Sequence, residues 1–147
     1  MFCSYRHCLL PSAFYLLTYM VNDPIGDFLV RLKNASSARK PAAMVRLSKM
    51  TEELALLLSK EGYVGEVSRK GKSKMLEVAL KYADGRPTLA GGRRISKPSK
   101  RVYMGVREIK PVKRGRGIMV FSTPKGLRTD KAARRERVGG EALFELW

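Results

Sequence analysis

Residues 23–34 read DPIGDFLVRLKN and predict the helix around which the first half of the chain is built. Asp23 and Pro24 are typical of a helix start, with aspartate as the N-cap and proline at the first helical position. The apolar residues that follow recur at helical spacing, at Ile25, Phe28, Leu29 and Leu32. We therefore expect an amphipathic helix with one buried face, followed by a polar loop over residues 34–41.

The chain after this helix predicts a short strand, a second helix and two more strands. The strand is expected at residues 43–47, and Ser48 is the N-cap candidate of a helix that Gly62 ends. The apolar face of that helix is expected to consist of Met50, Leu54, Leu57 and Leu58. Strands are expected at residues 63–67 and 75–82, the second because its apolar and polar residues alternate.

The second half of the chain has a different composition and predicts mainly strands. Residues 86–128 contain many lysines and arginines but a single acid, Glu108. Strands are expected at residues 88–96, 102–106, 117–123 and 143–147, with one short helix at 130–137 that Gly139 ends.

Together these patterns predict an α+β fold with two small subdomains. Residues 20–83 form an α/β unit with the order helix–strand–helix–strand–strand, residues 84–92 form a linker, and residues 93–147 form a β-rich unit with one short helix. The first residues differ from both: residues 1–19 are mostly apolar, and only Arg6 is charged. We expect them to be a non-structural extension or the result of an upstream start-codon assignment, with Met20 as the true start.

The charge of the chain points to a polyanionic partner. The 147 residues include 30 Lys and Arg but 13 Asp and Glu, which gives a formal net charge of +17. The charge is spread through the whole body rather than along one amphipathic helix, which favours nucleic acid over a membrane surface. Cys3, His7 and Cys8 all lie in the first eight residues, so the body can hold neither a Cys/His zinc site nor a histidine-based triad. We expect no enzyme activity, no metal and no cofactor.

Three features of the second half are candidates for RNA contact. Residues 122–126, Ser-Thr-Pro-Lys-Gly, follow an apolar strand and offer hydroxyls, a cation and flexible backbone to RNA, although the same residues also form ordinary turns. Tyr103 lies among basic residues and is either a base-stacking residue or a core aromatic. Gly139 and Gly140 either end the helix or allow close approach of another chain, with Glu141 accepting from a base.

Basic runs at residues 92–94, 97–101 and 110–116 contain almost no acids, and we interpret them as a phosphate-contacting surface.

An ordered set of short motifs runs through nearly all of residues 20–147. The motifs are Asp23-Pro24-Ile25-Gly26-Asp27, Arg31-Leu32-Lys33-Asn34, Ser48-Lys49, Lys60-Glu61-Gly62-Tyr63, Leu80-Lys81-Tyr82, Arg94-Ile95-Ser96-Lys97-Pro98, Arg101-Val102-Tyr103, Gly117-Ile118, Ser122-Thr123-Pro124-Lys125-Gly126, Thr129-Asp130 and Gly139-Gly140-Glu141. In this order they resemble the bacterial small ribosomal subunit protein S-eight (uS-eight) family. No single motif is decisive, and the specificity lies in their order.

The resemblance implies a non-enzymatic ribosomal protein of the cytoplasmic 30S-type small subunit. Such a protein binds the central domain of 16S rRNA early in assembly and contacts neighbouring small-subunit proteins. In some bacteria the family also represses its own operon by binding the mRNA. The resemblance implies that the RNA-binding residues of this chain are those that match the family's motifs: Arg31, Asn34, Lys49, Tyr103, Ser122, Thr123, Pro124, Lys125, Gly126, Gly139, Gly140 and Glu141. One departure is Pro124, which stands where the family loop often has a third hydroxyl-bearing residue.

Three other interpretations stay open at this point. A free-standing regulatory RNA or DNA binder would discriminate poorly among structured RNAs. An RNA-modifying enzyme would need a cofactor pocket or an acid–base pair, and the sequence predicts neither. A membrane-surface protein would be anchored by residues 1–20.

Overall fold

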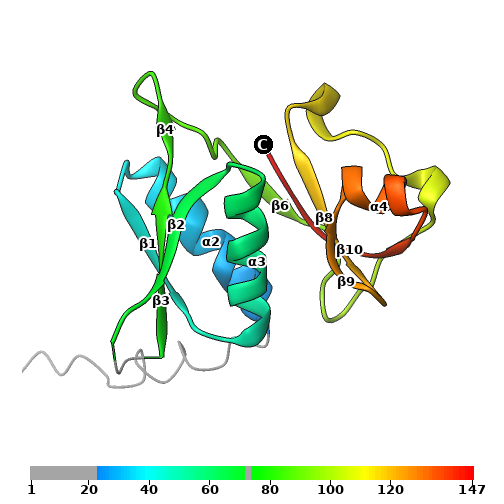
Figure 1. Ribbon diagram of the computed structural model, residues 1–147, viewed down its shortest axis with the longest axis horizontal. Coiled ribbons are helices and arrows are strands. Elements are labelled where there is room, and N and C mark those ends of the chain that lie inside the picture. Colours follow the sequence, from blue (N-terminus) through cyan, green and yellow to red (C-terminus); the bar gives the residue numbers. More distant parts are fainter. Residues whose placement is uncertain (1–22, 72–73) are drawn as a thin grey trace, which may run out of the picture.

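The computed structural model describes residues 23–71 and 74–147, so the expectation for residues 1–19 lies outside the described part of the chain. The first half contains two helices and a three-stranded antiparallel sheet. Its elements are α2 (Pro24–Ser37), β1 (Ala42–Arg46), α3 (Lys49–Lys60), β2 (Val64–Arg69) and β3 (Met75–Leu80). The strand order is β1-β3-β2, and both helices lie on the same side of the sheet (Figure 1). The predicted order helix–strand–helix–strand–strand is therefore confirmed.

A small hairpin and a second sheet follow. The hairpin consists of β4 (Tyr82–Ala83) and β5 (Arg86–Pro87). The strands of the second sheet are β6 (Gly92–Arg94), β7 (Tyr103–Met104), β8 (Ile118–Thr123), β9 (Gly126–Thr129) and β10 (Gly140–Leu146). Their order is β6-β10-β8-β9, and β7 also pairs with β10. The 3-10 turns η2 (Val106–Glu108) and η3 (Val112–Gly115) and the helix α4 (Asp130–Glu136) complete this β-rich part, so the α+β class is confirmed.

Helix α2 is longer than the sequence pattern predicted. Residues 34–37 continue the helix instead of forming a loop, because Ala35 and Ser36 extend the buried face by another turn. The hydroxyl of the buried Ser36 donates to the carbonyl oxygen of Leu89, 2.5 Å away, which fixes the end of the helix against the connection between the two sheets.

The start of α2 also differs from the prediction. Asp23 occupies the N-cap position, but its side chain accepts no capping hydrogen bond. Its Oδ2 instead accepts from Nε of Arg94 in β6 at 3.0 Å. A guanidinium on a neighbouring strand has therefore replaced the backbone N–H groups as the partner of this carboxylate.

Helix α3 has the predicted N-terminal cap. The Ser48 hydroxyl accepts from the N–H of Thr51, and the Thr51 hydroxyl accepts from the N–H of Ser48. Met50 was expected on the buried face but is 37% exposed, because it lies in the first turn, where Thr51 takes the inward position. Gly62, with φ +83, follows the helix in the left-handed region as predicted.

The second sheet corrects several predicted boundaries. The strand expected at residues 88–96 is confined to Gly92–Arg94, because the N–H groups of Ala90 and Gly91 both turn to the carbonyl of Trp147. The strand expected at 102–106 is confined to Tyr103–Met104, because Gly105 is the N-cap of the 3-10 turn η2, which begins at Val106. The final strand starts earlier than expected, at Gly140.

Two further corrections concern the turns of this sheet. Helix α4 ends through Arg137, which adopts the left-handed conformation with φ 53, and not through Gly139. Residues 126–129 form a strand that the pattern did not predict. Pro124 and Lys125 make a tight turn, so residues 126–129 fold back and pair with β8.

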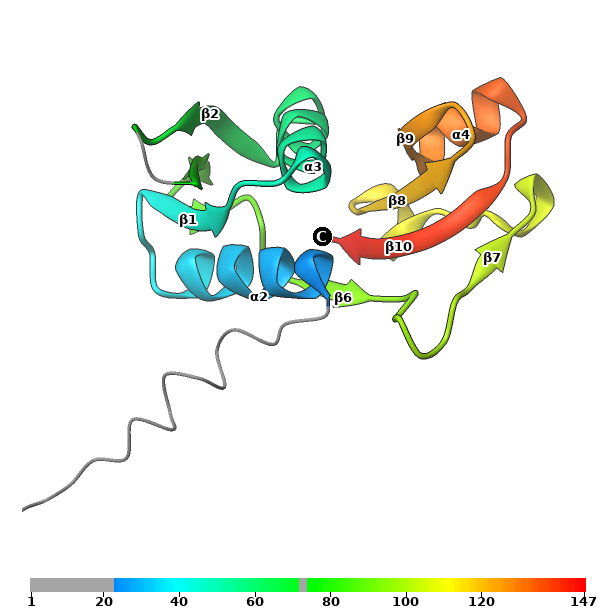
Figure 2. The ribbon, with the colours of Figure 1, turned by 90° about the horizontal axis from the view of Figure 1, so that it is seen from below.

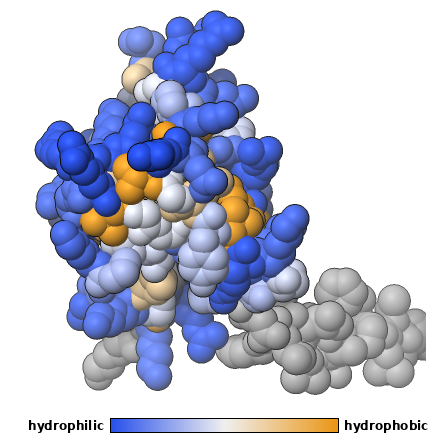
Figure 3. All heavy atoms as spheres, turned by 90° about the vertical axis from the view of Figure 1, so that its right-hand side faces the viewer, coloured by the Kyte–Doolittle hydropathy of each residue, from blue (hydrophilic) through white to orange (hydrophobic). Residues whose placement is uncertain are grey.

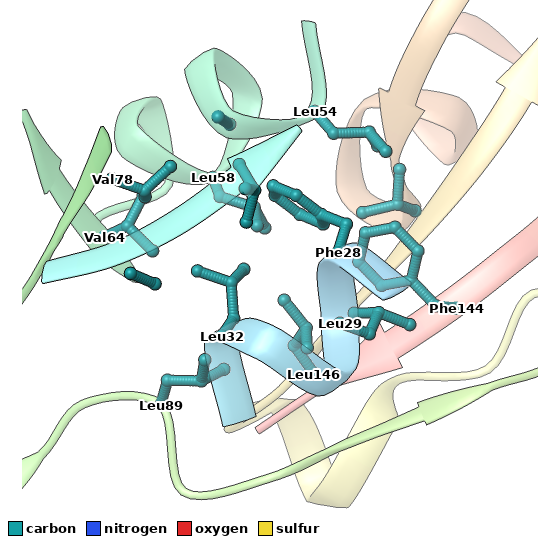
Figure 4. Close-up of a cluster of buried hydrophobic side chains, with 14 of the residues drawn as sticks. Phe28, Leu29, Leu32, Leu54, Leu58, Val64, Val78, Leu89, Phe144 and Leu146 are labelled. Carbon is teal, nitrogen blue, oxygen red and sulfur yellow. The ribbon is translucent and has the colours of Figure 1, made fainter. Parts of the chain in front are cut away.

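One hydrophobic core joins the two halves. Phe28 and Leu29 of α2 pack in the same buried cluster as Phe144 and Leu146 of β10 (Figure 4). A second cluster lies within the β-rich half, around the fully buried Phe121. Strand β10 therefore contributes to both clusters, which fixes the second sheet relative to the helices of the first half.

Candidate RNA-binding surface

Three of the predicted site residues lie in register across three strands. Glu141 in β10 is paired with Tyr103 of β7 on one side and with Ser122 of β8 on the other. Residues directly opposite each other in antiparallel strands point to the same face of a sheet. Tyr103, Glu141 and Ser122 therefore form one row, which we call the recognition row. The tyrosine is its most exposed member, at 71%, so it is not a core aromatic.

The strand after Ser122 ends in a hairpin turn. Thr123 pairs with Gly126, and Pro124 and Lys125 form the exposed turn between them. The Thr123 hydroxyl is buried and donates to the Gly126 carbonyl at 2.8 Å, so its hydrogen is used inside the turn. Gly126 has φ +98, which the turn requires. What this turn offers to a ligand is the Lys125 ammonium and backbone, with the Ser122 hydroxyl beside it in the recognition row.

The two glycines before Glu141 are needed for close packing inside the chain. A Cβ on Gly139 would lie 2.7 Å from the carbonyl oxygen of Met104, and one on Gly140 would overlap the carbonyl oxygen of Ser122. The sequence suggested a helix-ending glycine or an approach to another molecule. The structure assigns the helix end to Arg137 and shows that the glycines let β10 enter between β7 and β8, which aligns the recognition row.

Glu141 is held by two donors from the segment before β7. Its carboxylate accepts from the hydroxyl of the buried Ser96 and from Nη1 of Arg101, the latter at 2.7 Å. Burial acts to raise the pKa of Glu141, but the hydrogen bonds from Ser96 and Arg101 and the nearby guanidiniums outweigh it, so the pKa lies below its usual value. Glu141 is therefore ionised and engaged within the protein, which makes it a residue that positions the segment carrying Tyr103.

Many cations of the β-rich half have no acidic partner. Four acids of this half pair with particular arginines, in Arg93–Glu145, Arg101–Glu141, Arg128–Glu136 and Arg134–Asp130. Other exposed cations make no ion pair with any residue in the described part of the chain; among them are Lys97, Lys100, Arg107, Lys110, Arg114, Arg116, Lys125, Lys131, Arg135 and Arg137. Figure 3 shows mainly hydrophilic residues around a few hydrophobic ones on the face formed by this half. Such a surface is suited to phosphate groups.

The remaining predicted residues lie on the first half of the molecule. Arg31 and Asn34 are exposed on α2, and Lys49 is the first residue of α3. Nε of Arg31 is 2.8 Å from Asp27, and both residues line a pocket of about 490 Å³. Helix α2 and strand β7 lie at opposite sides of the molecule (Figure 2), so the structure does not bring Arg31 and Asn34 together with Tyr103.

The sequence pattern missed the roles of Ser96 and Arg101. Both lie in a motif and a basic run that were noted, but nothing in the spacing indicated that they would meet Glu141 forty or more residues later. In residues 23–71 and 74–147 there is no group of three or more His, Cys, Asp or Glu that could hold a metal ion. No helix of these residues is long and apolar enough to cross a membrane.

Comparison with known proteins identifies the family. The model of the ribosomal protein S8 family matches residues 23–147. The chain is 45% identical to the small ribosomal subunit protein uS8 of Persephonella marina, over 87% of this chain and 100% of the relative. It is 42% identical to that of Nitratidesulfovibrio vulgaris, over 87% and 100%, and 45% identical to that of Chloroflexus aurantiacus, over 86% and 98%. The chain belongs to the ribosomal protein S8 family, a family of structural, non-enzymatic proteins.

Proposed function

We propose that this protein is a structural component of the small ribosomal subunit that binds the central domain of 16S rRNA and organises that RNA during assembly. Family membership supports the ribosomal role. The observation that supports RNA recognition by the β-rich half is the recognition row, where an exposed aromatic ring and a hydroxyl flank a carboxylate already held by the protein.

The mechanism is architectural. Unpaired lysines and arginines hold phosphates, and these contacts orient the protein on the RNA without reading its sequence. Tyr103 stacks on an unpaired base, while the Ser122 hydroxyl and the hairpin turn at Pro124 and Lys125 reach ribose or base edges of an irregular helix. Glu141, Gly139 and Gly140 keep these groups in register, and Thr123 and Gly126 hold the turn. Binding selects one RNA conformation, which prepares the site for later proteins.

The first half supplies a second set of contacts. Arg31, Asn34 and Lys49 are exposed on its helices and bind RNA, while the rest of its surface adjoins neighbouring small-subunit proteins. Because recognition by shape does not distinguish rRNA from an mRNA with the same fold, the same surface represses the protein's own operon wherever that mRNA carries the fold.

A binding titration tests this function. The full chain is titrated with a central-domain rRNA fragment and with a length-matched scrambled RNA at several salt concentrations. We expect a preference of roughly 10³ or more for the central-domain fragment that persists at high salt. Equal affinity for both RNAs, with equally steep salt dependence, would mean that the protein binds RNA through its net charge alone and would contradict the proposed specific recognition.

Two substitutions localise the recognition. Tyr103→Ala should weaken binding to the central-domain fragment by about 1–3 kcal/mol through loss of stacking, and Ser122→Ala by about 1 kcal/mol through loss of a hydrogen bond. Tyr82→Ala and Ser68→Ala, at exposed positions of the first half, are the matched controls and should leave the affinity unchanged. If the control variants lose as much RNA affinity as Tyr103→Ala and Ser122→Ala, the recognition row is not the RNA-binding site.

A further inference from the structure

The turn before β8 has an unusual backbone. Lys113, Arg114 and Gly115 follow one another with φ angles of 46, 57 and 88, all in the left-handed region. Glycine adopts this conformation readily, but lysine and arginine rarely do, and two of them in succession require support from the surrounding structure. Residues 113–116, which we call the basic turn, are thus held in a conformation that their own sequence does not favour.

Several contacts supply that support. The Lys113 ammonium lies 4.9 Å from the centre of the Trp147 ring, a cation–π arrangement. The Tyr63 hydroxyl, from the first half, donates to the Arg116 carbonyl at 2.9 Å. Val112 before the turn is buried, and a Cβ on Gly117 after it would lie 2.5 Å from the Leu146 carbonyl oxygen. Both ends of the turn are therefore fixed to the core and to β10.

The supporting contacts leave two cations pointing to solvent. Arg114 and Arg116 are exposed, and their side chains make no ion pair or hydrogen bond with residues 23–71 or 74–147. The guanidinium group is a good ligand for RNA phosphates because its N–H donors match two phosphate oxygens. A strained backbone that aims two unpaired guanidiniums outward is typical of a binding element.

The position of the basic turn separates it from the recognition row. The turn adjoins Ile118 at the start of β8, whereas Ser122 and the hairpin turn lie at the other end of this six-residue strand. At about 3.3 Å per residue, the five steps from Ile118 to Thr123 place the two ends roughly 17 Å apart. That distance exceeds the reach of one arginine side chain, so the two places must contact different parts of an RNA.

We infer that the basic turn is a second RNA-backbone contact, in which Arg114 and Arg116 bind phosphates roughly one strand length from the recognition row. This inference rests on the proposed RNA-binding function and adds to it that two of the unpaired arginines form one discrete contact, held in place by the fixed backbone of the basic turn. In this arrangement Lys113 fixes the turn through Trp147, and the two arginines carry the contact.

Hydroxyl-radical footprinting on the central-domain rRNA fragment, combined with salt titrations, tests the inference. The double variant Arg114→Gln with Arg116→Gln removes both charges at exposed positions. We expect about tenfold weaker binding, a salt slope lower by up to about two units, and loss of one discrete block of backbone protection. The protection that depends on Tyr103 should persist.

Two further variants separate local contact from general charge. The matched control, Lys81→Gln with Arg86→Gln, removes two exposed cations, one beside the β4–β5 hairpin and one in it, and should leave every protected block in place. Gly115→Ala keeps all the charges and has open space for its Cβ, but strains the left-handed backbone, so it should weaken the same block as the arginine double variant. Circular dichroism checks that each variant is folded.

The outcomes are distinct. An unchanged footprint and salt slope in the arginine double variant would overturn the inference, and so would a uniform weakening of all protections. A wild-type chain without preference for the central-domain RNA would contradict the proposed function instead. In that case the salt slope of the arginine double variant on the scrambled RNA still decides whether the basic turn contacts a phosphate backbone.

Discussion

Glu141 has the largest structural role among the residues of the candidate surface. Its carboxylate ties Ser96 and Arg101 to β10, and its backbone pairs with the strands that carry Tyr103 and Ser122. The residue therefore affects recognition through the geometry of its neighbours. Its lowered pKa makes this role testable by pH, because the arrangement depends on the ionised form.

Glu141→Gln should destabilise the protein by about 1 kcal/mol at neutral pH, since the ion pair with Arg101 is lost and the hydrogen bond from Ser96 becomes a neutral one. A carboxylate with a depressed folded-state pKa stabilises the fold above its usual value of 4.5, and this contribution is lost as the pH falls through the folded-state pKa. The difference between wild type and variant in urea denaturation should therefore shrink in acid. A difference that stays constant with pH would argue against the ionised network. Glu145→Gln, four residues along the same strand and paired with the exposed Arg93, is the control and should show a smaller effect at neutral pH.

At the scale of elements, the main link between the halves outside the core is the contact of α2 with β6. Arg94 is 11% exposed, pairs with Asp23 through Nε at 3.0 Å, and donates from Nη1 to the Leu143 carbonyl at 2.5 Å. One side chain thus joins the start of α2, strand β6 and strand β10. The shielding of this pair from water makes it stronger than an ordinary surface ion pair.

Asp23→Ala should lower the free energy of unfolding by about 1–3 kcal/mol, because the partly buried Arg94 loses its charged hydrogen-bond partner. Asp27→Ala on the same helix is the matched control. Its pair with Arg31 is an exposed i,i+4 pair, so its removal should lower the free energy of unfolding by about 0.5 kcal/mol or less. Urea denaturation of both variants measures the difference, and equal losses would mean that the Asp23–Arg94 pair does not link the halves.

At the scale of the whole molecule, the two sheets depend on one core. Phe28 and Leu29 come from the first half, Phe144 and Leu146 come from the last strand, and all four side chains lie in one buried cluster (Figure 4). Each half without the other would expose part of this cluster to water, so we expect residues 23–147 to unfold in one cooperative transition.

Phe144→Ala should lower the free energy of unfolding by about 3–5 kcal/mol through the cavity it leaves. The loss should appear equally in far-UV circular dichroism, which reports the helices of the first half, and in the fluorescence of Trp147 in the second half. Leu56→Ala, at a position that is 54% exposed, is the control and should change stability by about 0.5 kcal/mol or less. Separate transitions for the two signals would show that the halves unfold independently.

The sequence could predict the order of elements and the chemical class of partner. The apolar spacing of Ile25 to Leu32 and the alternation in residues 75–80 are local properties, so they specified a helix and a strand directly. The Ser48 cap and the left-handed Gly62 were predictable for the same reason. The charge of +17 needs no structure to indicate a polyanion.

Tertiary structure alone decided what those elements do together. The sequence predicted that Asp23 caps a helix, but its carboxylate accepts from Arg94, 71 positions away. The sequence also predicted that Gly139 ends a helix, but this glycine is needed because it packs closely against Met104. The recognition row likewise depends on strand pairing between residues far apart in the chain, and the strained basic turn depends on contacts with the distant Tyr63 and Trp147. The physical reason is that backbone periodicity acts over a few residues, whereas the partner of a buried charge or a close-packed glycine is set by whichever distant segment the fold brings beside it.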